Sequence, residues 1–376
     1  MKVLISGGAG FIGSNLALKL IGNGYEVILL DNLSKQIHGE NPDESYTFNL
    51  IKNKCELIVG DVTNFEDWRK SLKDVEIVVH LAAETGTGQS MYEVNKYVDV
   101  NISGTAKLME VITNENHKLK KIIIASSRAI YGEGKYLCDE HGVVYPEPRK
   151  DQLMRIGDFE AKCPICNHNV EMLPTDENSK LHPTSVYGLT KQSQEDLCMI
   201  IGKSINLPVI AFRFQNVYGP GQSLKNPYTG ILSIFSTRIR NENDLNIFED
   251  GLETRDFVYI EDITDSIILG IESSNADFQS FNVGSGEKTD VLTVANTLKE
   301  KYNSNININI TGNYRLGDIR HNLGDLTKIK SQLGFEPKVN FVQGISNFVD
   351  WVEEQSIEND NYDASIEEMK LKGLYK

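Results

Sequence analysis

Short apolar runs alternate along the first half of the chain with longer segments in which apolar residues recur every three to four positions. The short runs predict strands and the longer segments predict helices, because these are the side-chain periods of the two structures. Their alternation predicts an α/β fold in which a doubly wound parallel sheet is covered by helices on both faces. The predicted strands are residues 2–6, 25–30, 55–59, 77–81 and 121–125, and the clearest predicted helices are 14–22, 65–73 and 101–115.

Three glycines stand at the turn between the first predicted strand and the first predicted helix. Gly7 permits the tight turn, Gly10 lets the backbone approach a pyrophosphate, and Gly13 lets helix and strand pack closely. A phosphate bound there would lie at the helix N-terminus, whose N–H groups are free. A plain turn is the alternative, but the strand before and the helix after favour a dinucleotide site in a Rossmann-type domain.

The second half of the chain is less regular. An apolar run at 209–214 extends the alternating pattern, after which glycines and prolines are frequent and sheet character resumes at 306–310. We therefore predict a Rossmann-type domain over 1–213 and a smaller α/β domain over 214–376, with the chain crossing between them near 255–285. The stretch from Glu353 onward is acidic. It is either helical or loosely docked, or a solvated tail, and its composition favours the tail.

Two carboxylates end predicted strands on the side where the dinucleotide would bind. Asp31 follows the second strand, where a carboxylate meets the ribose hydroxyls and repels a 2′-phosphate, which favours NAD over NADP. Asp61 follows the third strand and is a candidate acceptor for the adenine amino group. The alternative for Asp61 is a helix cap for the segment that begins near Asn64.

Candidate catalytic side chains follow the strand at 121–125 and lie further along the chain. The hydroxyls of Ser126 and Ser127 come at the carboxyl end of that strand, where ligands of open α/β sheets bind. Tyr187 and Lys191 are one helical turn apart, so that an ammonium near the phenol would lower its pKa and make it a proton-transfer group. Ser127 would orient the substrate oxygen. Alternatively, Tyr187 is a core residue and the serines cap a helix.

Composition excludes several classes of protein. The net charge of the 376-residue chain is −15, whereas nucleic-acid binding needs a basic face. No apolar run approaches the ~20 residues of a membrane span. The five cysteines, an odd number without a secretory leader, indicate thiols in a reducing compartment, and we predict a cytoplasmic protein.

The segment between Ser127 and Tyr187 is longer than the fold requires, and residues 133–180 contain a Cys/His pattern. Cys138 and His141 are followed by Cys163 and Cys166, which is the ligand spacing of a structural zinc site. His168 is a reserve ligand. Coincidence among the five cysteines is the alternative, and the other two, Cys55 and Cys198, are predicted to lie in the core.

Taken together, these residues resemble the extended short-chain dehydrogenase/reductase superfamily, in particular its sugar-nucleotide branch, from Met1 to about Phe335. The resemblance rests on the glycine loop, Asp31, Asp61-Val62, His80-Leu81-Ala82-Ala83, Ser127, Tyr187/Lys191, Arg213-Phe-Gln-Asn216-Val-Tyr-Gly-Pro220, Arg255-Asp-Phe-Val-Tyr259 and Arg315-Leu-Gly-Asp318. It implies catalysis by Ser127, Tyr187 and Lys191, a nucleotide-sugar substrate and a homodimer. The NAD contacts that it implies, besides Tyr187 and Lys191, are Gly7, Gly10, Phe11, Ile12, Gly13, Asp31, Asn32, Asp61, Val62, Leu81, Ala82, Ala83 and Asn101.

The resemblance also implies a set of substrate contacts. Asn216 resembles a residue at the diphosphate, Arg255 and Arg315 resemble a diphosphate clamp, Phe248 resembles a base-stacking ring, and Asp318 resembles a ribose acceptor. For the arginines the alternative is a surface salt bridge, and for Phe248 it is the core. Glu84, Thr85 and Ser127 complete the predicted substrate contacts.

The resemblance further restricts the reaction. Related 4,6-dehydratases carry an Asp-Glu pair after the catalytic hydroxyl, whereas this chain has Arg128-Ala129 there. The glutamate of related decarboxylases and the cysteine of 3,5-epimerases are also missing near Ser127. Hydride chemistry alone remains, which predicts an NAD-dependent nucleotide-sugar 4-epimerase, an isomerase. A 4-ketoreductase and a non-catalytic dinucleotide sensor are the alternatives.

The Cys/His insert and the segment 213–230 resemble the dTDP-L-rhamnose 4-epimerases, which interconvert dTDP-L-rhamnose and dTDP-6-deoxy-L-talose, more than the UDP-glucose 4-epimerases. We therefore expect the former substrate pair, with UDP-hexoses as the alternative.

Overall fold

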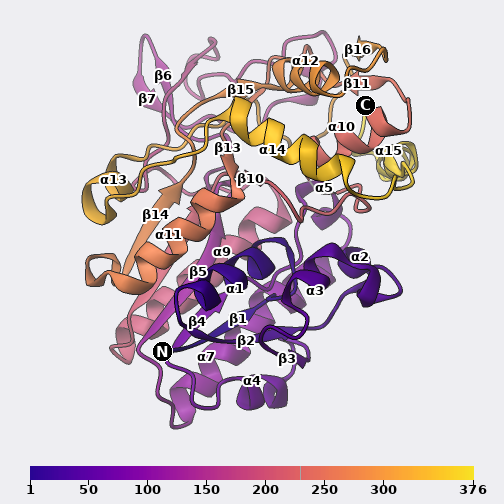
Figure 1. Ribbon diagram of the computed structural model, residues 1–376. Helices are drawn as coiled ribbons and strands as arrows, with labels where there is room; N and C mark the ends of the chain where they lie inside the picture. The colour runs from indigo at the N-terminus through magenta and orange to yellow at the C-terminus, as the bar shows by residue number, and fades with distance from the viewer. Residues whose placement is uncertain (229) are drawn as a thin grey trace.

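A seven-stranded parallel sheet forms the centre of the computed structural model, which describes residues 1–228 and 230–376 (Figure 1). The strand order is β14-β9-β5-β4-β1-β2-β3. This confirms the predicted doubly wound α/β fold. The strands are β1 (Lys2–Ser6), β2 (Glu26–Asp31), β3 (Glu56–Val59), β4 (Ile77–His80), β5 (Lys121–Ser127), β9 (Val209–Phe214) and β14 (Gln279–Val283).

Helices cover both faces of this sheet, so its strands are apolar throughout rather than alternating. On one face Ile5 of β1 packs with residues such as Leu16 and Ile267. On the other face Leu4 packs with residues such as Trp68 and Leu108. The helices of the first face are α1 (Phe11–Gly22), α11 (Ile260–Glu272) and α13 (Thr327–Leu333), and those of the second are α4 (Phe65–Ser71), α7 (Gly104–Asn114) and α9 (Val186–Ser204).

Shorter helical segments lie in the loops at the carboxyl ends of the strands. The predicted helix 101–115 begins with a π-helical turn, η2 (Val98–Ser103), before α7. Such turns are frequent at functional sites. No helix in the described part of the chain is long and apolar enough to cross a membrane. The other short segments are α2 (Lys35–His38), η1 (Pro42–Glu44), α3 (Tyr46–Ile51), α5 (Thr87–Ser90), α6 (Val94–Tyr97) and η3 (Arg128–Tyr131).

The second half of the chain builds a smaller unit with its own core, in which Phe235, Leu298 and Phe348 pack together. Its strands form three pairs: β10 (Asn216–Tyr218) with β13 (Phe257–Tyr259), β11 (Leu245–Ile247) with β16 (Ile308–Ile310), and β12 (Thr254–Arg255) with β15 (Thr289–Asp290). Its helices are α10 (Ile231–Arg240), α12 (Val291–Lys301) and α14 (Phe341–Glu353). Between these elements the chain returns to the large sheet through α11, η4 (Ser274–Ala276) and β14.

The insert between β5 and α9 forms a small antiparallel sheet in the order β7-β6-β8. A short core of its own, which includes Tyr136, Val144 and Val170, holds it together. Its elements are β6 (Tyr136–Cys138), β7 (Gly142–Val144), α8 (Asp151–Met154) and β8 (Glu171–Met172). The sheet lies on the side of the smaller unit, away from β1 to β4 (Figure 1).

The prediction of a solvated tail after Glu353 is wrong for its last part. The segment ends in α15 (Tyr362–Leu371), which docks near α10 (Figure 1). The Tyr228 hydroxyl donates to Glu368 at 2.5 Å. Arg238 contacts Asp360 at 3.1 Å, and its guanidinium lies 4.5 Å from the centre of the Tyr362 ring. The acidic composition gave no indication of the apolar pair Ile366 and Met369. Their spacing of three residues puts both on one buried helix face.

Candidate active site

A cavity of about 590 Å³ opens where the carboxyl ends of β1, β2, β4 and β5 meet. Ligands of open α/β sheets bind at such an edge. The structure brings most of the predicted NAD contacts and all three predicted catalytic side chains to its wall. Those in the wall are Gly7, Gly10, Phe11, Ile12, Gly13, Asp31, Asn32, Val62, Leu81, Ala82, Ala83, Ser127, Tyr187 and Lys191.

The glycine loop has the shape that a pyrophosphate needs. Gly7 has a φ of +69°, and a Cβ there would lie 2.8 Å from the backbone nitrogen of Ala82. A Cβ on Gly13 would collide with the backbone of Gly7 and Gly8. No side chain caps the N-terminus of α1 at Gly10, so its first N–H groups are available to an anion in the cavity. These residues fit the diphosphate of NAD.

Asp31 is held at the cavity wall by backbone donors. Its carboxylate accepts from the N–H groups of Ala9 and Leu33, both at 2.9 Å. Burial raises the pKa of Asp31, while these bonds and His38, 3.9 Å away, oppose the rise. His38, which the sequence patterns did not identify, lines the same cavity, and burial lowers its pKa. The carboxylate fits the predicted role as acceptor for ribose hydroxyls.

Two predicted NAD contacts lie behind the wall instead. The Asp61 carboxylate accepts from Asn32 at 3.0 Å and from the Thr63 N–H at 2.8 Å, while only its neighbours Gly60 and Val62 line the cavity. Burial raises its pKa, but these bonds outweigh burial and lower it overall. The alternative cap role belongs to Asn64, which accepts from the Glu66 N–H.

Asn101 is the second of these contacts. Its side chain is fully buried, and its amide forms hydrogen bonds with neighbouring residues. The oxygen accepts from the Glu84 N–H at 2.7 Å, and the nitrogen donates to the Glu84 carbonyl at 3.1 Å and to Thr190 at 2.9 Å. Asn101 therefore positions the Glu84 loop against α9, and its neighbour Val100 faces the cavity.

The predicted proton-transfer group is in place beside its hydroxyl partner. Ser127 is the last residue of β5, and Tyr187 stands in the first turn of α9. Burial raises the pKa of the Tyr187 phenol, while a hydrogen bond with Ser127 and the charge of Arg128 oppose the rise. The alternative reading of Ser127 also holds, since its hydroxyl accepts from the Ala129 N–H and caps η3. Tyr187 is not a core residue, because it lines the cavity.

Lys191 differs from expectation. We expected its ammonium to lower the pKa of Tyr187, but the cation that does so is Arg128. Lys191 is buried and donates to Gln194 at 2.7 Å. Burial lowers its pKa to about 7. The spacing from Tyr187 predicts the face of α9 on which Lys191 lies. It does not predict which residue the long lysine side chain contacts.

A second cavity of about 220 Å³ adjoins the first, and the predicted substrate residues gather around both. Arg128, Ala129 and Asn216 line the two cavities, so the predicted catalytic hydroxyls of Ser127 and Tyr187 lie near their junction. The Asn216 side-chain oxygen is buried and has no partner in the described part of the chain, so it can accept from a ligand. Glu84 and Thr85 line the first cavity, and Phe248, Arg255, Arg315 and Asp318 line the second.

Three arginines and three carboxylates line the second cavity, and the side chains are arranged differently from the expected clamp. Arg315 donates to the Asp318 carboxylate at 2.8 Å, so this carboxylate is already engaged. The same guanidinium lies 5.3 Å from the centre of the Phe248 ring. The centre of the Tyr375 ring lies 5.2 Å from that of Phe248, and the two rings meet edge to face. Arg255 donates to backbone carbonyls, such as that of Ile319 at 2.9 Å, rather than to a carboxylate.

Comparison with known proteins agrees with this geometry. Residues 3–149 match the family described as NAD dependent epimerase/dehydratase, and residues 169–348 match the family described as GDP-mannose 4,6 dehydratase. A dTDP-L-rhamnose 4-epimerase from Burkholderia thailandensis is 35% identical over 94% of this chain and 95% of its own length. The chain belongs to the NAD-dependent epimerase/dehydratase family of extended short-chain dehydrogenases/reductases.

Solved structures of this family share the fold. A UDP-glucose 4-epimerase from Thermotoga maritima with UDP-glucose is 30% identical, with a TM-score of 0.77 over 94% of this chain and 99% of that one. A UDP-glucuronic acid 4-epimerase from Bacillus cereus with UDP-glucuronic acid and NAD is 25% identical, with a TM-score of 0.75 and the same coverage. The prediction of an NAD-dependent nucleotide-sugar epimerase is confirmed at this level.

Several wall residues of this family member were not identified from its sequence. Tyr228 lines both cavities, and Tyr362, Ile366 and Met369 of α15 line the second. Met369 also approaches Gly88 of the large domain, where an added Cβ would lie 3.6 Å from its sulfur. The helical spacing of Ile366 and Met369 was a usable signal, whereas nothing near Tyr228 identified it.

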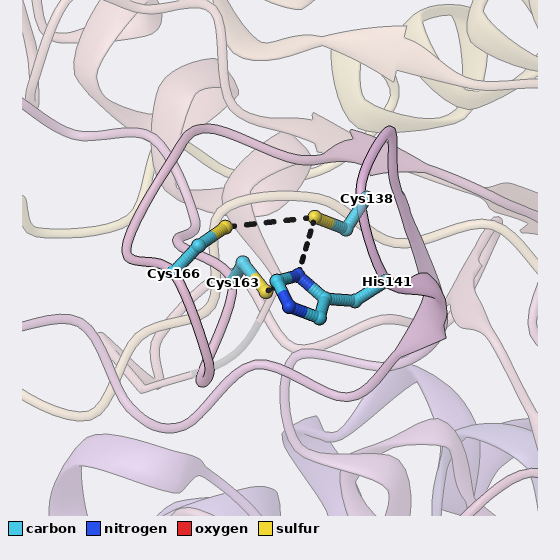
Figure 2. A group of neighbouring side chains, drawn as sticks. All are labelled: Cys138, His141, Cys163 and Cys166. Atoms are coloured by element: carbon cyan, nitrogen blue, oxygen red, sulfur yellow. Dashed lines mark hydrogen bonds between the residues drawn. The ribbon is translucent and has the colours of Figure 1, made fainter.

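The four predicted metal ligands converge in the insert (Figure 2). Cys138 Sγ lies 3.5 Å from His141 Nδ1 and 3.7 Å from Cys166 Sγ, and Cys163 Sγ lies 3.8 Å from His141 Nδ1. Tetrahedral zinc with its usual bond lengths separates such ligands by about 3.5–3.8 Å. The four side chains therefore fit a zinc ion. His168 instead contacts Glu140 at 2.9 Å, outside this group.

Proposed function

We propose that this protein is an NAD-dependent nucleotide-sugar 4-epimerase that interconverts dTDP-L-rhamnose and dTDP-6-deoxy-L-talose. The observation that carries the proposal is the junction of the two cavities. Ser127 and Tyr187 line the first cavity beside this junction and would act as a proton-transfer pair. Arg128 and Ala129 line both cavities and occupy the places where dehydratases of this family carry their acid pair. With no such pair at these two places, elimination of water has no acid–base group to support it, and oxidation with reduction at one carbon is left.

In the reaction, Tyr187 takes the proton of the sugar 4-hydroxyl and later returns it to the same oxygen. Ser127 donates a hydrogen bond to that oxygen and holds it beside the phenol. Bound NAD supplies a hydride acceptor that becomes the hydride donor. Asp31 and the glycine loop would hold the adenosine half of the dinucleotide. Turning over the oxidised sugar within the cavity before reduction inverts C4, and no outside reductant is consumed.

Support for the sugar and base comes from one relative. The Burkholderia thailandensis protein, named a dTDP-L-rhamnose 4-epimerase, is 35% identical across almost the whole chain. A UDP-hexose is the second candidate, favoured by the Thermotoga maritima structure at 30% identity. A 4-ketoreductase shares the same residues but would consume its cofactor. A non-catalytic dinucleotide sensor is disfavoured, because it would have no use for Tyr187 and Lys191.

The experiment combines a substrate panel with isotope labelling. The NAD-loaded protein is incubated in deuterated water with dTDP-L-rhamnose, UDP-glucose and UDP-glucuronic acid, and products are identified by mass spectrometry and NMR. We expect C4 inversion of dTDP-L-rhamnose, no deuterium at C3, C4 or C5, and no use of added NADH. Deuterium at C3 or C5 would indicate enolisation, loss of water would indicate a dehydratase, and NADH consumption would indicate a ketoreductase. NADP released on denaturation would contradict the cofactor assignment.

We also propose a structural zinc ion held by Cys138, His141, Cys163 and Cys166. Two features besides ligand spacing support it. The Ile165 N–H points to Cys163 Sγ at 3.4 Å, as in loops that bind a metal through two nearby cysteines. The ligands also come from two separate hairpins, so a metal would join them and stabilise a small core.

We also propose that the protein forms a homodimer. Leu189 and Ile200 on α9 are 51% and 67% exposed. They are eleven residues apart, about three helical turns, so both lie on one face, where a second copy would cover them. Light scattering with Leu189→Lys as the test variant should show a loss of dimer. The cytoplasmic location stays a prediction. None of the five cysteines forms a disulfide within the described residues.

A further inference from the structure

Arg128 is a cation in the candidate active site, and the mechanism above gives it no role. It follows the catalytic Ser127 directly, begins η3 and lines both cavities. Its guanidinium makes no hydrogen bond and no ion pair with any residue that the structure describes. Other poorly exposed arginines are paired with carboxylates: Arg149 with Glu249, Arg213 with Glu195, Arg238 with Asp360, and Arg320 with Glu160 and Asp250.

The carboxylates near Arg128 are already engaged. Asp318 is bound by Arg315 at 2.8 Å. Glu133 lies 3.4 Å from Arg149 and accepts from the backbone N–H of Arg320 at 2.9 Å. Arg128 is only partly exposed, and a charge that is partly withdrawn from water is costly to hold without a partner. A side chain kept in that state at the junction of two cavities indicates a ligand that supplies the missing anion.

The position of Arg255 indicates which anion this is. Arg128 and Arg255 both line the second cavity and repel each other, which together with burial lowers the pKa of Arg128 to about 10. The nearby Glu253 offsets them only in part, because burial raises its pKa to about 7, and one carboxylate cannot neutralise two guanidinium groups. Two guanidinium groups that share a cavity are complementary to a diphosphate, which carries one negative charge on each phosphate.

We propose that Arg128 binds the diphosphate of the nucleotide sugar, on the phosphate that carries the sugar. Arg128 lines both cavities, whereas Tyr187, where the sugar would react, lines the first and Arg255 lines the second. With the nucleoside in the second cavity, the phosphate that carries the sugar would lie at Arg128. Arg128 thereby fixes the distance between the anchored diphosphate and the proton-transfer group. It also lowers the pKa of Tyr187 and so favours the phenolate. The proposal rests on the nucleotide-sugar function proposed above.

The test measures binding and catalysis separately. Calorimetry on the NAD-loaded protein compares dTDP with thymidine and UDP with uridine, for the wild type, Arg128→Met, Arg128→Lys and the surface control Arg69→Met. We expect Arg128→Met to weaken diphosphate binding by about 10–100-fold, with nucleoside binding and NAD content unchanged. Arg128→Lys should recover part of the loss, and Arg69→Met should bind as the wild type does.

A pH profile distinguishes a positioning role from a merely structural one. Ser127 and Arg128 are the groups that lower the pKa of Tyr187, so removing the charge should move the acid limb of kcat to higher pH in Arg128→Met but not in Arg128→Lys. Unchanged dTDP and UDP binding in Arg128→Met would overturn the proposal. If this variant also lost turnover of UDP-glucuronic acid alone, the ligand of Arg128 would be the carboxylate of a sugar and not the diphosphate. A wild type that binds neither diphosphate would instead refute the nucleotide-sugar function itself.

Discussion

Nζ of Lys191 donates a 2.7 Å hydrogen bond to Oε1 of Gln194, one turn further along α9. The Gln194 amide nitrogen in turn donates to Thr105 at 2.8 Å, and Thr105 lies 2.9 Å from a ring nitrogen of His80. The other ring nitrogen of His80 lies 2.6 Å from the Ser6 hydroxyl. Lys191 thus ends a buried polar chain that joins α9 to α7, β4 and β1. No carboxylate within the described residues forms an ion pair with it.

This environment predicts a pH dependence of stability. Burial lowers the pKa of Lys191 to about 7, whereas an unfolded lysine has a pKa of about 10.4. Between these values the unfolded chain binds more protons at this residue than the folded one, so its contribution to stability rises with pH, by up to about 1.4 kcal/mol per pH unit. The penalty is fully present below pH 7.

Urea unfolding of the cofactor-free wild type and of Lys191→Met at pH 7, 8 and 9 measures this effect. The free energy of unfolding should rise more steeply with pH in the wild type than in the variant. Equal slopes would mean that Lys191 stays charged in the folded protein. Lys191→Met should also lower both activity and NAD retention, if the ammonium serves the cofactor when it is bound.

Tyr187→Phe should lower kcat by about 10²–10⁴-fold, the usual contribution of a positioned acid–base group. NAD content should stay near that of the wild type, because the backbone N–H of Tyr187, which donates to Ser90 at 3.0 Å, is retained. Tyr25→Phe is the matched control, since its hydroxyl donates an exposed hydrogen bond to Glu272 at 3.2 Å and lies outside the two cavities. Activity close to the wild type in Tyr187→Phe would remove this residue from proton transfer.

Periodicity and strand ends were sufficient to predict six of the seven strands of the large sheet and the first cavity, because parallel strands place their carboxyl ends together. The edge strand β14 was missed, since it lies in the less regular second half of the chain. Asp31 and Ser127 were found this way, as each ends a strand. Contacts that depend on the direction of a long side chain were not accessible. The turn of Lys191 toward Gln194 is one example, and the bond between Arg315 and Asp318, which engages an expected ribose acceptor, is another.

The role of the C-terminal segment was missed for a different reason. Charge composition describes the exposed face of a short helix, while docking depends on a few apolar residues such as Ile366 and Met369, whose partners lie far away in the sequence. Asn101 illustrates the converse: an expected ligand contact became a buried support, because its amide bonds to the Glu84 backbone and Thr190 satisfy it fully.

Deletion of residues 357–376 tests the contribution of α15 to the second cavity. Ile366 and Met369 form part of its wall, so the deletion should raise KM for the nucleotide sugar by roughly tenfold, which corresponds to about 1.4 kcal/mol of lost contact. Of the deleted residues, Glu358 alone lines the first cavity, while those of α15 line the second, so kcat and NAD content should change little.

A milder variant accompanies the deletion, in case the shortened chain folds poorly. Tyr228→Phe removes the hydroxyl that donates to Glu368 and lies 2.8 Å from the Tyr92 hydroxyl, and it leaves the rest of the helix in place. It should raise KM in the same direction by a smaller factor. An unchanged kcat/KM in both variants would show that the segment packs beside the site without serving it.

Zinc bound by the four ligands of the insert should be measurable, and its loss should affect the binding of substrate in the second cavity. Elemental analysis should find about one zinc ion per chain, and Cys163→Ser should lose it and lower the thermal stability of the insert. Cys55→Ser is the control, since Cys55 belongs to the large domain and lies far from the group in the fold. A metal-free wild type of unchanged stability would contradict the zinc proposal.

The effect should extend beyond the insert because two arginine pairs join this segment to the wall of the second cavity. Arg149 holds Glu249 through bonds of 2.8 and 2.7 Å, and Glu160 accepts from Arg320 at 2.7 Å. Glu249 lines the cavity directly. Loss of the metal should therefore raise KM for the nucleotide sugar while leaving NAD content unchanged. If Cys163→Ser loses zinc but keeps the KM of the wild type, the insert is an independent unit and these pairs do not couple it to the substrate.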